Sequence, residues 1–539
     1  MLNRPSYIAP ASPWPEAEGG FEPYERVVKR HEARRKRAAA GGAGGAAAWF
    51  SSRKGVLLSV LGATLLLWLV AIDRNTDVRG RIRAKLHSAT HSLHDLTAEP
   101  VEPFDRSLVL NFPYPQNTLE SQLKPGVRYV TTMSYGGHAN QFMAIENLLY
   151  LAKLLNRVAI IPTLTPLHFD ETPRDFSQFY DLDRFYHETE IPAVELSSVK
   201  WWNFSAPPPK EDLSCWSILE QTAGGRNVND GSINIDVKYF PLPKMGRGSE
   251  GFNIWFEAIH DFDFDWVSRG QWLSKVRKEL LPQKPAPEGA AASFVPVNRH
   301  ANLKDGFDPG RDHPPRDELF CLDTTFFMGS RIFPPAFPPQ VHLEPLRSYE
   351  GHGWIDAGQY LRFSAELEQL ADIYLLSLFD ATSSKDIPPF ITVHIRRGDF
   401  SAARGLTSLD KFTDAVDRVR EKLHWRMDNP DGWTGAGKGR EKYAKGVRGE
   451  QYAVVATTDE KPGSPFVRQL LDLGWKVMDH EEMNTSEELG NWYPAMIDAA
   501  VLARGAGFVG TEWSTFSYLA GLRVKYWNGG VEEWTPSLA

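Results

Sequence analysis

The sequence predicts an α/β protein with two domains, each built on a parallel β-sheet, that face each other across a cleft. The chain has 539 residues, which is too long for a single hydrophobic core. Strand and helix patterns alternate in two separate blocks, as in parallel sheets that are covered by helices. An uncharged apolar segment at residues 55–72 precedes both blocks and adds a membrane-spanning helix to the predicted architecture.

The composition is that of a globular enzyme with deep pockets. Hydrophobic residues make up 42% of the chain, charged residues 24%, and there are 17 Trp. The net charge of -8 argues against nucleic acid as a partner. An anionic ligand therefore needs a local concentration of positive charge.

Residues 55–72 are predicted to cross a lipid bilayer once. As a helix the segment is about 27 Å long, which approaches the thickness of a bilayer core. It begins too far from residue 1 for a cleaved signal peptide. More basic residues precede the segment than follow it, which predicts a cytosolic N-terminus and a lumenal C-terminal part. They are Arg26, Lys29, Arg30, Arg34, Arg35, Lys36, Arg37, Arg53 and Lys54 before it, and Arg74, Arg79, Arg81, Arg83 and Lys85 after it.

The predicted organisation has five parts. Residues 1–54 are a disordered cytosolic tail, because they are rich in Pro, Ala, Gly and basic residues. Residues 55–72 are the membrane helix and residues 73–105 a stalk. Residues 106–360 form the first α/β domain and residues 361–539 the second. Long surface inserts interrupt the two domains at residues 283–317 and 428–450.

Two features accord with a secretory lumen. Asn203 and Asn484 each begin an acceptor sequence for N-glycosylation, a pattern that also arises by chance. The chain has two cysteines, Cys215 and Cys321, which would form one bridge in an oxidising compartment or remain two buried thiols. The sequence leaves this choice open.

The first block reads as a βαβ unit. A short strand at residues 127–132 leads into a Gly-containing turn at residues 134–140, and an amphipathic helix follows at residues 141–156. The next strand is Val158–Ile161. The unit predicts a parallel sheet, with Gly136 and Gly137 where the backbone can approach a ligand closely. Asn140 in this turn would contact a ligand or only cap the helix.

The second block begins with a helix at residues 363–379 and a strand at residues 390–395. Further strands are predicted at residues 452–456, 476–478 and 507–510, with helices at residues 493–504 and 514–522. The first strand runs directly into Arg396 and Arg397. Adjacent guanidinium groups at the carboxyl end of a buried strand are typical of a phosphate site, because Arg grips phosphate oxygens with paired hydrogen bonds. The alternative is that both arginines pair with surface carboxylates.

Two further segments carry candidate ligand groups. Residues 510–517 join a strand to a helix and contain Thr511, Ser514, Thr515 and Ser517, whose hydroxyls and nearby backbone N–H groups suit a diphosphate. Simple capping of the helix by Ser514 or Thr515 is the alternative. Asp498 lies on the preceding helix, where it would accept hydrogen bonds from a base or face solvent.

Asp261, Asp263 and Asp265 alternate with aromatic residues. Some sugar transferases use this pattern to bind a divalent cation next to a nucleotide diphosphate. It equally fits a half-buried strand with one solvent-exposed face.

The chain resembles the GDP-fucose O-fucosyltransferase family over roughly residues 128–527. The motif His394-Ile395-Arg396-Arg397-Gly398-Asp399-Phe400 is similar to the central motif of the family. The segments from Asn140 to Arg157 and from Ser514 to Ser517 are similar to its first and third motifs, in the same order. The resemblance implies a GT-B-like fold of two Rossmann-like domains, the first on the acceptor side and the second holding the nucleotide sugar. It also implies an inverting, metal-independent transfer with GDP-fucose as donor and without a cofactor.

The resemblance implies one catalytic residue, Arg396, which would bind the β-phosphate and stabilise the charge that develops on departing GDP. It implies donor-binding roles for a further set of residues: Gly137, Asn140, His394, Arg397, Asp399, Asp498, Ser514, Thr515 and Phe516. Some members carry a Glu in the first motif as general base, and Gly136 and Gly137 stand there instead. Glu146, Asp399 or a group of the acceptor would serve, or the base is dispensable.

We therefore expect a lumenal fucosyltransferase of the Golgi or endoplasmic reticulum membrane that acts on a hydroxyl of a protein or glycan. Two alternatives remain from the sequence. One is a metal-dependent transferase of another nucleotide sugar that uses Asp261, Asp263 and Asp265. The other is a non-catalytic membrane protein that binds a GDP-sugar.

Overall fold

The computed structural model describes residues 102–535 except for 168, 202–209, 218–227, 230–234, 242–253, 256–317, 327, 330–351, 399–405 and 429–451. The predicted tail, the membrane segment and nearly all of the stalk lie outside these residues, as do Asn203, Asp399 and the aspartates at 261–265. Among the helices that are described, none is both long and apolar enough to cross a bilayer.

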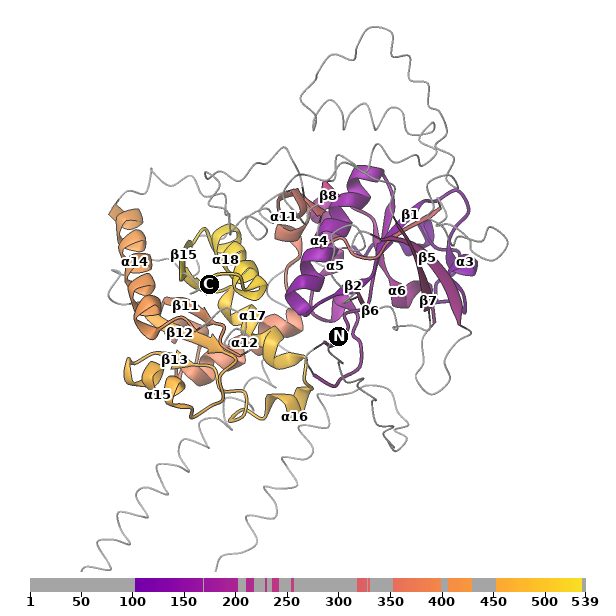
Figure 1. The fold of residues 1–539 in the computed structure, drawn as a ribbon. Coiled ribbons are helices and arrows are strands. Elements are labelled where there is room, and N and C mark those ends of the chain that lie inside the picture. Colours follow the sequence, from indigo (N-terminus) through magenta and orange to yellow (C-terminus); the bar gives the residue numbers. More distant parts are fainter. Residues whose placement is uncertain are drawn as a thin grey trace, which may run out of the picture.

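The first half of the described chain is built on a six-stranded parallel sheet, at the right of Figure 1. Its strand order is β4-β3-β1-β9-β5-β7, and the strands are listed here in chain order: β1 Tyr129–Thr132, β3 Val158–Ile161, β4 Ala193–Glu195, β5 Glu211–Ser217, β7 Ile235–Pro241 and β9 Leu319–Leu322. Helix α4 (His138–Leu155) packs on β1 and β3. The predicted βαβ unit is confirmed. The helix begins at residue 138, however, so Asn140 lies in its first turn and not in the preceding turn.

The second half has a five-stranded parallel sheet, at the left of Figure 1. Its order is β13-β12-β11-β14-β15, with the bounds β11 Phe390–Ile395, β12 Ala453–Thr458, β13 Lys476–Val477, β14 Gly507–Thr511 and β15 Val531–Thr535. Three helices pack next to this sheet: α14 (Leu409–Asp428), α17 (Tyr493–Leu502) and α18 (Thr515–Asn528). A fourth, α15 (Pro465–Asp472), contacts β13.

The sequence analysis missed α14, α15 and β15, and it ended the last helix six residues too early, at 522 instead of Asn528. The helix α12 (Ala365–Leu378) and the strands β11, β12, β13 and β14 lie close to their predicted positions. The remaining short elements, mainly in the first half, are η1 Arg106–Leu108, α3 Leu119–Gln122, β2 Ser134–Tyr135, η2 Phe176–Gln178, α5 Leu182–Thr189, α6 Leu196–Val199, β6 Val228–Asn229, β8 Ile254–Trp255, β10 Met328–Gly329, α11 His352–Asp356, η6 Gly358–Tyr360, η7 Ser384–Asp386 and α16 Thr485–Leu489.

Strand β11 shows why a buried strand carries polar side chains. Ile391, Val393 and Ile395 point to one face and join the core beneath α14. The alternate residues point to the opposite face because side chains alternate along a strand. There Thr392 donates a hydrogen bond from Oγ1 to the carbonyl of Leu502 at 2.9 Å.

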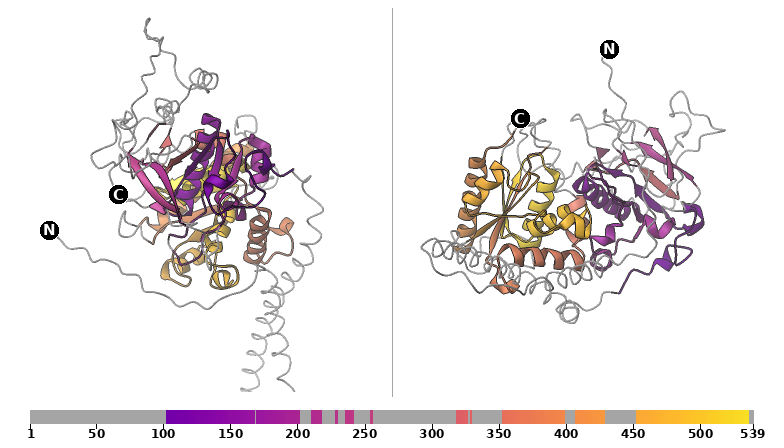
Figure 2. Two further views of the ribbon diagram at one scale, coloured as in Figure 1. Left: turned by 90° about the vertical axis from the view of Figure 1, so that its right-hand side faces the viewer. Right: turned by 90° about the horizontal axis from the view of Figure 1, so that it is seen from below.

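One hydrophobic core runs through both halves. It joins Phe142 and Tyr180 of the first half to Met496, Tyr518 and Trp527 of the second without interruption. Helices α4 and α18 contact each other, and Figures 1 and 2 show the two halves side by side with these helices on the facing sides. The halves are therefore fixed against each other by shared packing.

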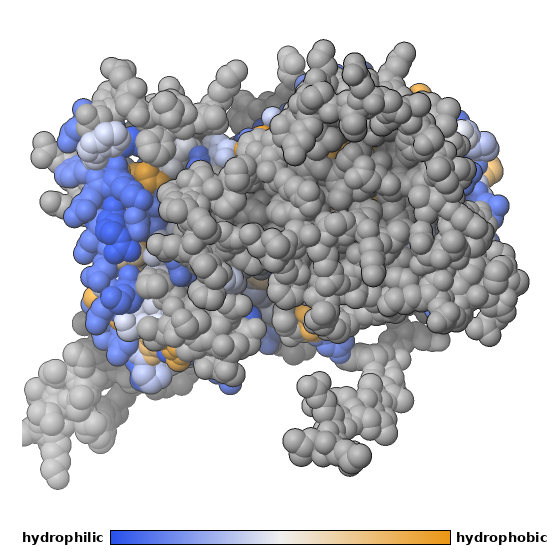
Figure 3. Space-filling view, turned by 45° about the horizontal axis from the view of Figure 1, so that its top comes forward, coloured by the Kyte–Doolittle hydropathy of each residue, from blue (hydrophilic) through white to orange (hydrophobic). Residues whose placement is uncertain are grey.

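The surface of the described residues is mainly hydrophilic where it can be seen at the left of Figure 3, with hydrophobic side chains in small separate groups. The large exposed hydrophobic residues are Leu108, Phe112, Tyr114, Leu167, Trp201, Trp425, Leu471 and Leu473.

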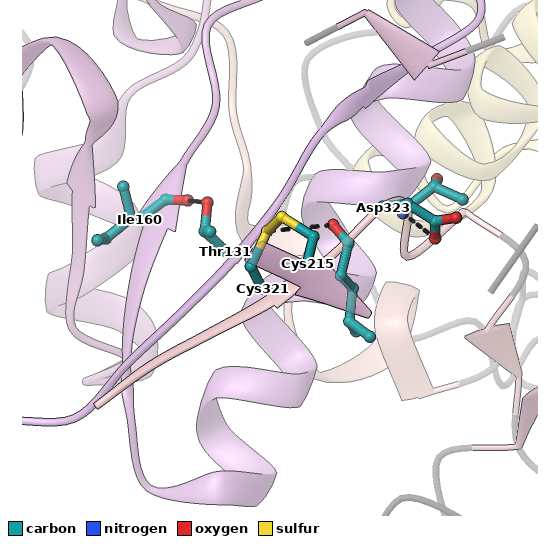
Figure 4. The surroundings of a disulfide bond; sticks show 7 residues. Thr131, Ile160, Cys215, Cys321 and Asp323 are labelled. Atoms are coloured by element: carbon teal, nitrogen blue, oxygen red, sulfur yellow. Dashed lines mark hydrogen bonds between the residues drawn. A yellow bond between two sulfur atoms is a disulfide. The ribbon is translucent and has the colours of Figure 1, made fainter. Parts of the chain in front are cut away.

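Cys215 and Cys321 form a disulfide, which settles the choice that the sequence left open. Cys215 lies in β5 and Cys321 in the neighbouring strand β9, and Figure 4 shows the bridge between these strands. The bridge lies close to Thr131 of β1, whose hydroxyl donates to the carbonyl of Ile160 at 2.8 Å. It closes a loop across 106 residues and ties two strands far apart in sequence.

Candidate active site

The second sheet has a topological switch point at the carboxyl ends of β11 and β14. From β11 the chain continues to β12 and β13 on one side, and β14 and β15 then lie on the other side. Open parallel sheets bind their ligands in the crevice at such a point. Arg396 follows β11 directly, and the start of α18 follows β14, so the two predicted phosphate-binding segments lie next to each other.

Hydrogen bonds connect these two segments. Thr511, at the end of β14, donates its hydroxyl to the carbonyl of His394 and accepts the backbone N–H of Arg396, both at 3.0 Å. The geometry of the Arg loop is therefore fixed by the neighbouring strand.

Asp459 holds the Arg loop from the other side. It follows β12, and its carboxylate accepts the backbone N–H groups of Arg397 at 2.8 Å and Gly398 at 3.0 Å. The same carboxylate pairs with Nη1 of Arg396 at 2.8 Å. A Cβ atom on Gly398 would lie 2.6 Å from Asp459 Oδ2, so the close approach requires glycine.

The two arginines differ in how they are held. Arg397 donates from Nε to Glu460 at 2.7 Å, and its guanidinium lies 3.9 Å from the centre of the Phe466 ring. Its side chain is 16% exposed, whereas that of Arg396 is 29% exposed. Both arginines pair with carboxylates, as the alternative interpretation of the sequence expected. Arg396 nevertheless has the more exposed side chain.

His394 is buried and neutral. Burial lowers its pKa to about 3, with the charge of Arg396 adding to this effect and Asp459 opposing it. Its Nδ1 lies 2.6 Å from Ser517 Oγ, and this oxygen accepts the N–H of Thr511 at 3.2 Å. Neutral His394 has one N–H group, so it presents an Nε2–H donor when the Ser517 hydroxyl donates to Nδ1, and an Nε2 acceptor when Nδ1–H donates to Ser517.

The start of α18 is capped from within the chain. Ser514 accepts the N–H of Ser517 at 3.3 Å, which confirms the capping role that was one of the two interpretations. Thr515 and Phe516 occupy the first two helical positions, whose N–H groups have no partner inside a helix. Trp513 precedes the cap with φ of 67°, a left-handed conformation that is costly for an aromatic residue. Strain of this kind is concentrated at functional sites.

The start of α4 has the properties of a second ligand-binding turn. Gly137 is its N-cap residue and provides no side-chain cap. Gly136 has φ of 65°, and a Cβ atom there would lie 2.4 Å from Asn140 Nδ2. Gln141 fixes the turn by donating to the carbonyl of Gly136 at 2.8 Å. The buried Oδ1 of Asn140 has no hydrogen-bond partner within the described part of the chain.

The carboxylate of Asp498 already has a hydrogen-bond partner within the chain. Its carboxylate lies 2.9 Å from His480 Nε2, and His480 Nδ1 lies 3.0 Å from Thr485 Oγ1. Burial alone would lower the pKa of His480, but Asp498 and the nearby Asp479 outweigh it and raise this pKa. Contact between Asp498 and a nucleotide base, which the resemblance implies, stays a prediction and would compete with His480.

Glu146 does not face the switch point. It lies in the middle of α4 with 1% of its surface exposed, next to Trp354 and Gly358. Burial raises the pKa of Glu146 well above its ordinary value, with Arg523 opposing the shift. An enclosed carboxyl group is poorly placed to take a proton from an acceptor hydroxyl. Asp399, the other carboxylate considered for this role, lies outside the described residues.

The described residues contain no group of three His, Cys, Asp or Glu that would hold a metal ion. The aspartates at 261–265 lie outside the described residues, and the metal site that they would form stays a prediction.

Sequence reasoning overlooked Asp459 and Glu460 as site residues. Asp459 and Glu460 directly follow the strand that neighbours β11. Acidic residues directly after a predicted parallel strand indicate a site residue, because the carboxyl ends of parallel strands meet at one edge of the sheet.

Two parallel α/β sheets, with a guanidinium and a helix start at the switch point, are features of enzymes that bind nucleotide sugars. The sequence comparison agrees, and the chain is a glycosyltransferase. Residues 297–526 match the family described as GDP-fucose protein O-fucosyltransferase. The family prediction from the sequence is confirmed.

The chain is also similar to solved fucosyltransferase structures. POFUT1 in complex with GDP-fucose is 13% identical, with 77% of this chain and 99% of that chain covered and a TM-score of 0.39. The fucosyltransferase NodZ from Bradyrhizobium is 11% identical, with coverages of 73% and 92% and a TM-score of 0.30. None of the curated proteins matches the chain in sequence.

Proposed function

We propose that this chain transfers fucose from GDP-fucose to a hydroxyl of a protein or glycan, with inversion at the sugar carbon and without a metal ion. The observation that carries the proposal is the position of Arg396. Its partly exposed guanidinium lies at the switch point of the second sheet, next to the first turn of α18. It would neutralise the β-phosphate as GDP departs, which is electrostatic catalysis.

The ion pair with Asp459 does not block this role. Both side chains are partly exposed, at 29% and 24%, and such a pair contributes roughly 0–1 kcal/mol. A hydrogen bond to a charged group contributes about 1.5–3 kcal/mol. A diphosphate that makes paired bonds with Arg396 therefore displaces Asp459, while Asp459 keeps its two backbone N–H donors.

The second half would hold most of the nucleotide. Nε2 of His394 would form a hydrogen bond with the nucleotide, and the N–H groups at Thr515 and Phe516 would bind phosphate. Gly137 and Asn140 would reach the donor from the first half, so the fold would serve as a two-domain GT-B arrangement.

The cell compartment is part of the proposal. We expect a single-pass type II protein of the Golgi or endoplasmic reticulum membrane, anchored by residues 55–72. The disulfide between Cys215 and Cys321 supports an oxidising lumen, because such bridges are rare in the cytosol. The exposed Asn484, which begins a glycosylation sequence, is consistent with it.

The test uses the full-length chain in detergent. Calorimetry is expected to show binding of GDP and GDP-fucose and weaker binding of UDP. GDP-fucose should be turned over to free GDP in the presence of EDTA, and Arg396→Ala should abolish most of this turnover. A protein that binds none of these nucleotides would refute the proposal, and turnover that stops on chelation would favour the metal-dependent alternative.

The burial of Glu146 favours a second candidate, a GDP-sugar-binding protein without catalysis. Tight binding of GDP-fucose with no release of GDP on any acceptor panel would identify it.

A further inference from the structure

Arg523 is a fully buried cation at the contact between the two halves. It lies in α18 and is 1% exposed. Its Nη2 donates to the hydroxyl of Tyr180 at 3.2 Å, and this hydroxyl lies 3.0 Å from Nε2 of His138, the first residue of α4. The guanidinium also lies 4.8 Å from the ring centre of Phe142 and 4.6 Å from that of Phe363.

The hydrogen bonds form a chain from Arg523 through Tyr180 to His138. Arg523 is only a donor, so the oxygen of Tyr180 accepts from it. The Tyr180 hydroxyl and His138 Nε2 share the next bond, whose donor depends on the tautomer of His138. Burial lowers the pKa of His138 to about 3, with the charge of Arg523 adding to the effect. Arg523 therefore fixes the orientation of the first residue of α4 through a single tyrosine.

Aromatic faces surround the charge of Arg523. No ion pair is recorded for it among the described residues, and its Nε is buried there without a hydrogen-bond partner. Glu146 interacts with it electrostatically, yet burial raises the pKa of Glu146. Burying a cation without a bound carboxylate is costly, and an apolar side chain of similar volume would pack here at least as well. Stability alone does not account for an arginine at this position.

The cluster connects the first turn of α4 with helix α18. In the proposed function the first turns of both helices bind the same nucleotide sugar. His138 lies two residues before Asn140 in the first turn of α4. Arg523 lies in the same helix as Thr515 and Phe516, eight residues after Thr515, which is about 12 Å along the helix. The position of Asn140 relative to the nucleotide-binding half thus depends on the contact from Arg523 through Tyr180 to His138.

We infer that Arg523 is a positioning residue for the donor site: it holds the first turn of α4 so that Asn140 faces the nucleotide sugar bound by the second half. The inference rests on the proposed function. Arg523 does not touch the donor itself. Its substitution should therefore impair sugar transfer more than it impairs the binding of GDP.

The experiment compares the full-length wild type with Arg523→Met, Arg523→Lys and Tyr180→Phe. For each protein, calorimetry gives the Kd of GDP, GDP release gives kcat and KM for GDP-fucose, and a thermal scan gives the Tm. Arg504→Lys is the matched control, because Arg504 is also a buried arginine of the second half but binds Glu368 and Asp372 of α12.

Arg523→Met and Arg523→Lys should lower kcat/KM by about 10-fold to 10²-fold, the loss expected when a binding group is slightly misplaced. The Kd of GDP should change by less than about threefold. Tyr180→Phe should change the same parameters in the same direction. In the double variant with Arg523→Lys the two effects should not add, because residues of one network couple. Arg504→Lys should leave the ratio of kcat/KM to GDP affinity unchanged.

Two results would overturn the inference alone. One is wild-type kcat/KM in the Arg523 variants. The other is a loss of GDP affinity and Tm in proportion to the loss of turnover, which a purely structural role predicts. If the Arg523 variants do not fold, Tyr180→Phe decides, since it removes one oxygen and keeps the ring contacts. A wild type that does not bind GDP would instead refute the proposed function, and the inference with it.

Discussion

Arg396 and Arg397 are adjacent in sequence, and the structure predicts opposite consequences for their replacement by alanine. Arg396→Ala removes a partly exposed ion pair and should cost less than about 1 kcal/mol of unfolding free energy. Asp459 still accepts its two backbone N–H groups after the change. The loss of the group that neutralises the leaving diphosphate should lower kcat by roughly 10²-fold to 10³-fold.

Arg397→Ala should mainly lower stability. It removes an ion pair with Glu460, worth roughly 0–1 kcal/mol, and a stacking contact with Phe466. A cation over an aromatic ring contributes about 0.5–2 kcal/mol, depending on its desolvation. The expected total is on the order of 1–3 kcal/mol, with a smaller loss of kcat than for Arg396→Ala.

The assay measures the thermal midpoint and the rate of GDP release for both variants of the full-length chain. A loss of 1 kcal/mol lowers the midpoint by only about 1 °C in a cooperative unit of this size, so Arg397→Ala should lose about 1–3 °C and Arg396→Ala less than about 1 °C. Arg418→Ala, which removes an exposed ion pair with Glu533, is the control for both readouts. Near-normal turnover in Arg396→Ala, or lost turnover in a fully stable Arg397→Ala, would refute the reasoning.

Three further outcomes follow from other parts of the structure. Replacing Cys215 and Cys321 together by alanine should cost about 4–5 kcal/mol in urea unfolding, because the bridge closes a loop across 106 residues; a loss below about 1 kcal/mol would contradict this. Expression in a eukaryotic secretory pathway should give a glycosidase-sensitive mobility shift that Asn484→Gln reduces, and an unchanged shift would exclude this site. Stability should fall as the pH drops from about 6.5 toward 3, because His394 and His138 each take up a proton only in the unfolded chain across that range. His394→Gln should flatten this pH dependence, and a slope equal to that of the wild type would refute the assignment.

The strands β1, β3, β11, β12 and β14 lie close to where the sequence analysis placed them, because buried parallel strands appear as short apolar runs. Helix α14 was readable as well: Phe412, Val416, Val419 and Leu423 have helical spacing. Strand β15 was not readable, because only its first and last residues are buried and alternation is lost.

The motif residues of the candidate site could be selected from sequence, but which carboxylate each arginine contacts could not. The contact of Arg396 with Asp459 depends on the pairing of β11 with β12, which brings together residues more than sixty positions apart. The same limit applies to the bridge between Cys215 and Cys321, which requires β5 and β9 to be neighbours. Local patterns contain no information on such long-range order.

The core that joins Phe142 and Tyr180 to Met496 and Trp527 has a practical consequence for fragments and chimaeras. Residues 361–539 expressed alone would present to water the apolar surface that normally covers the first half, and would aggregate. An exchange of the nucleotide-binding half between related enzymes would have to carry over the matching face of α4 as well. Heating the intact chain should give one cooperative calorimetric transition for both halves.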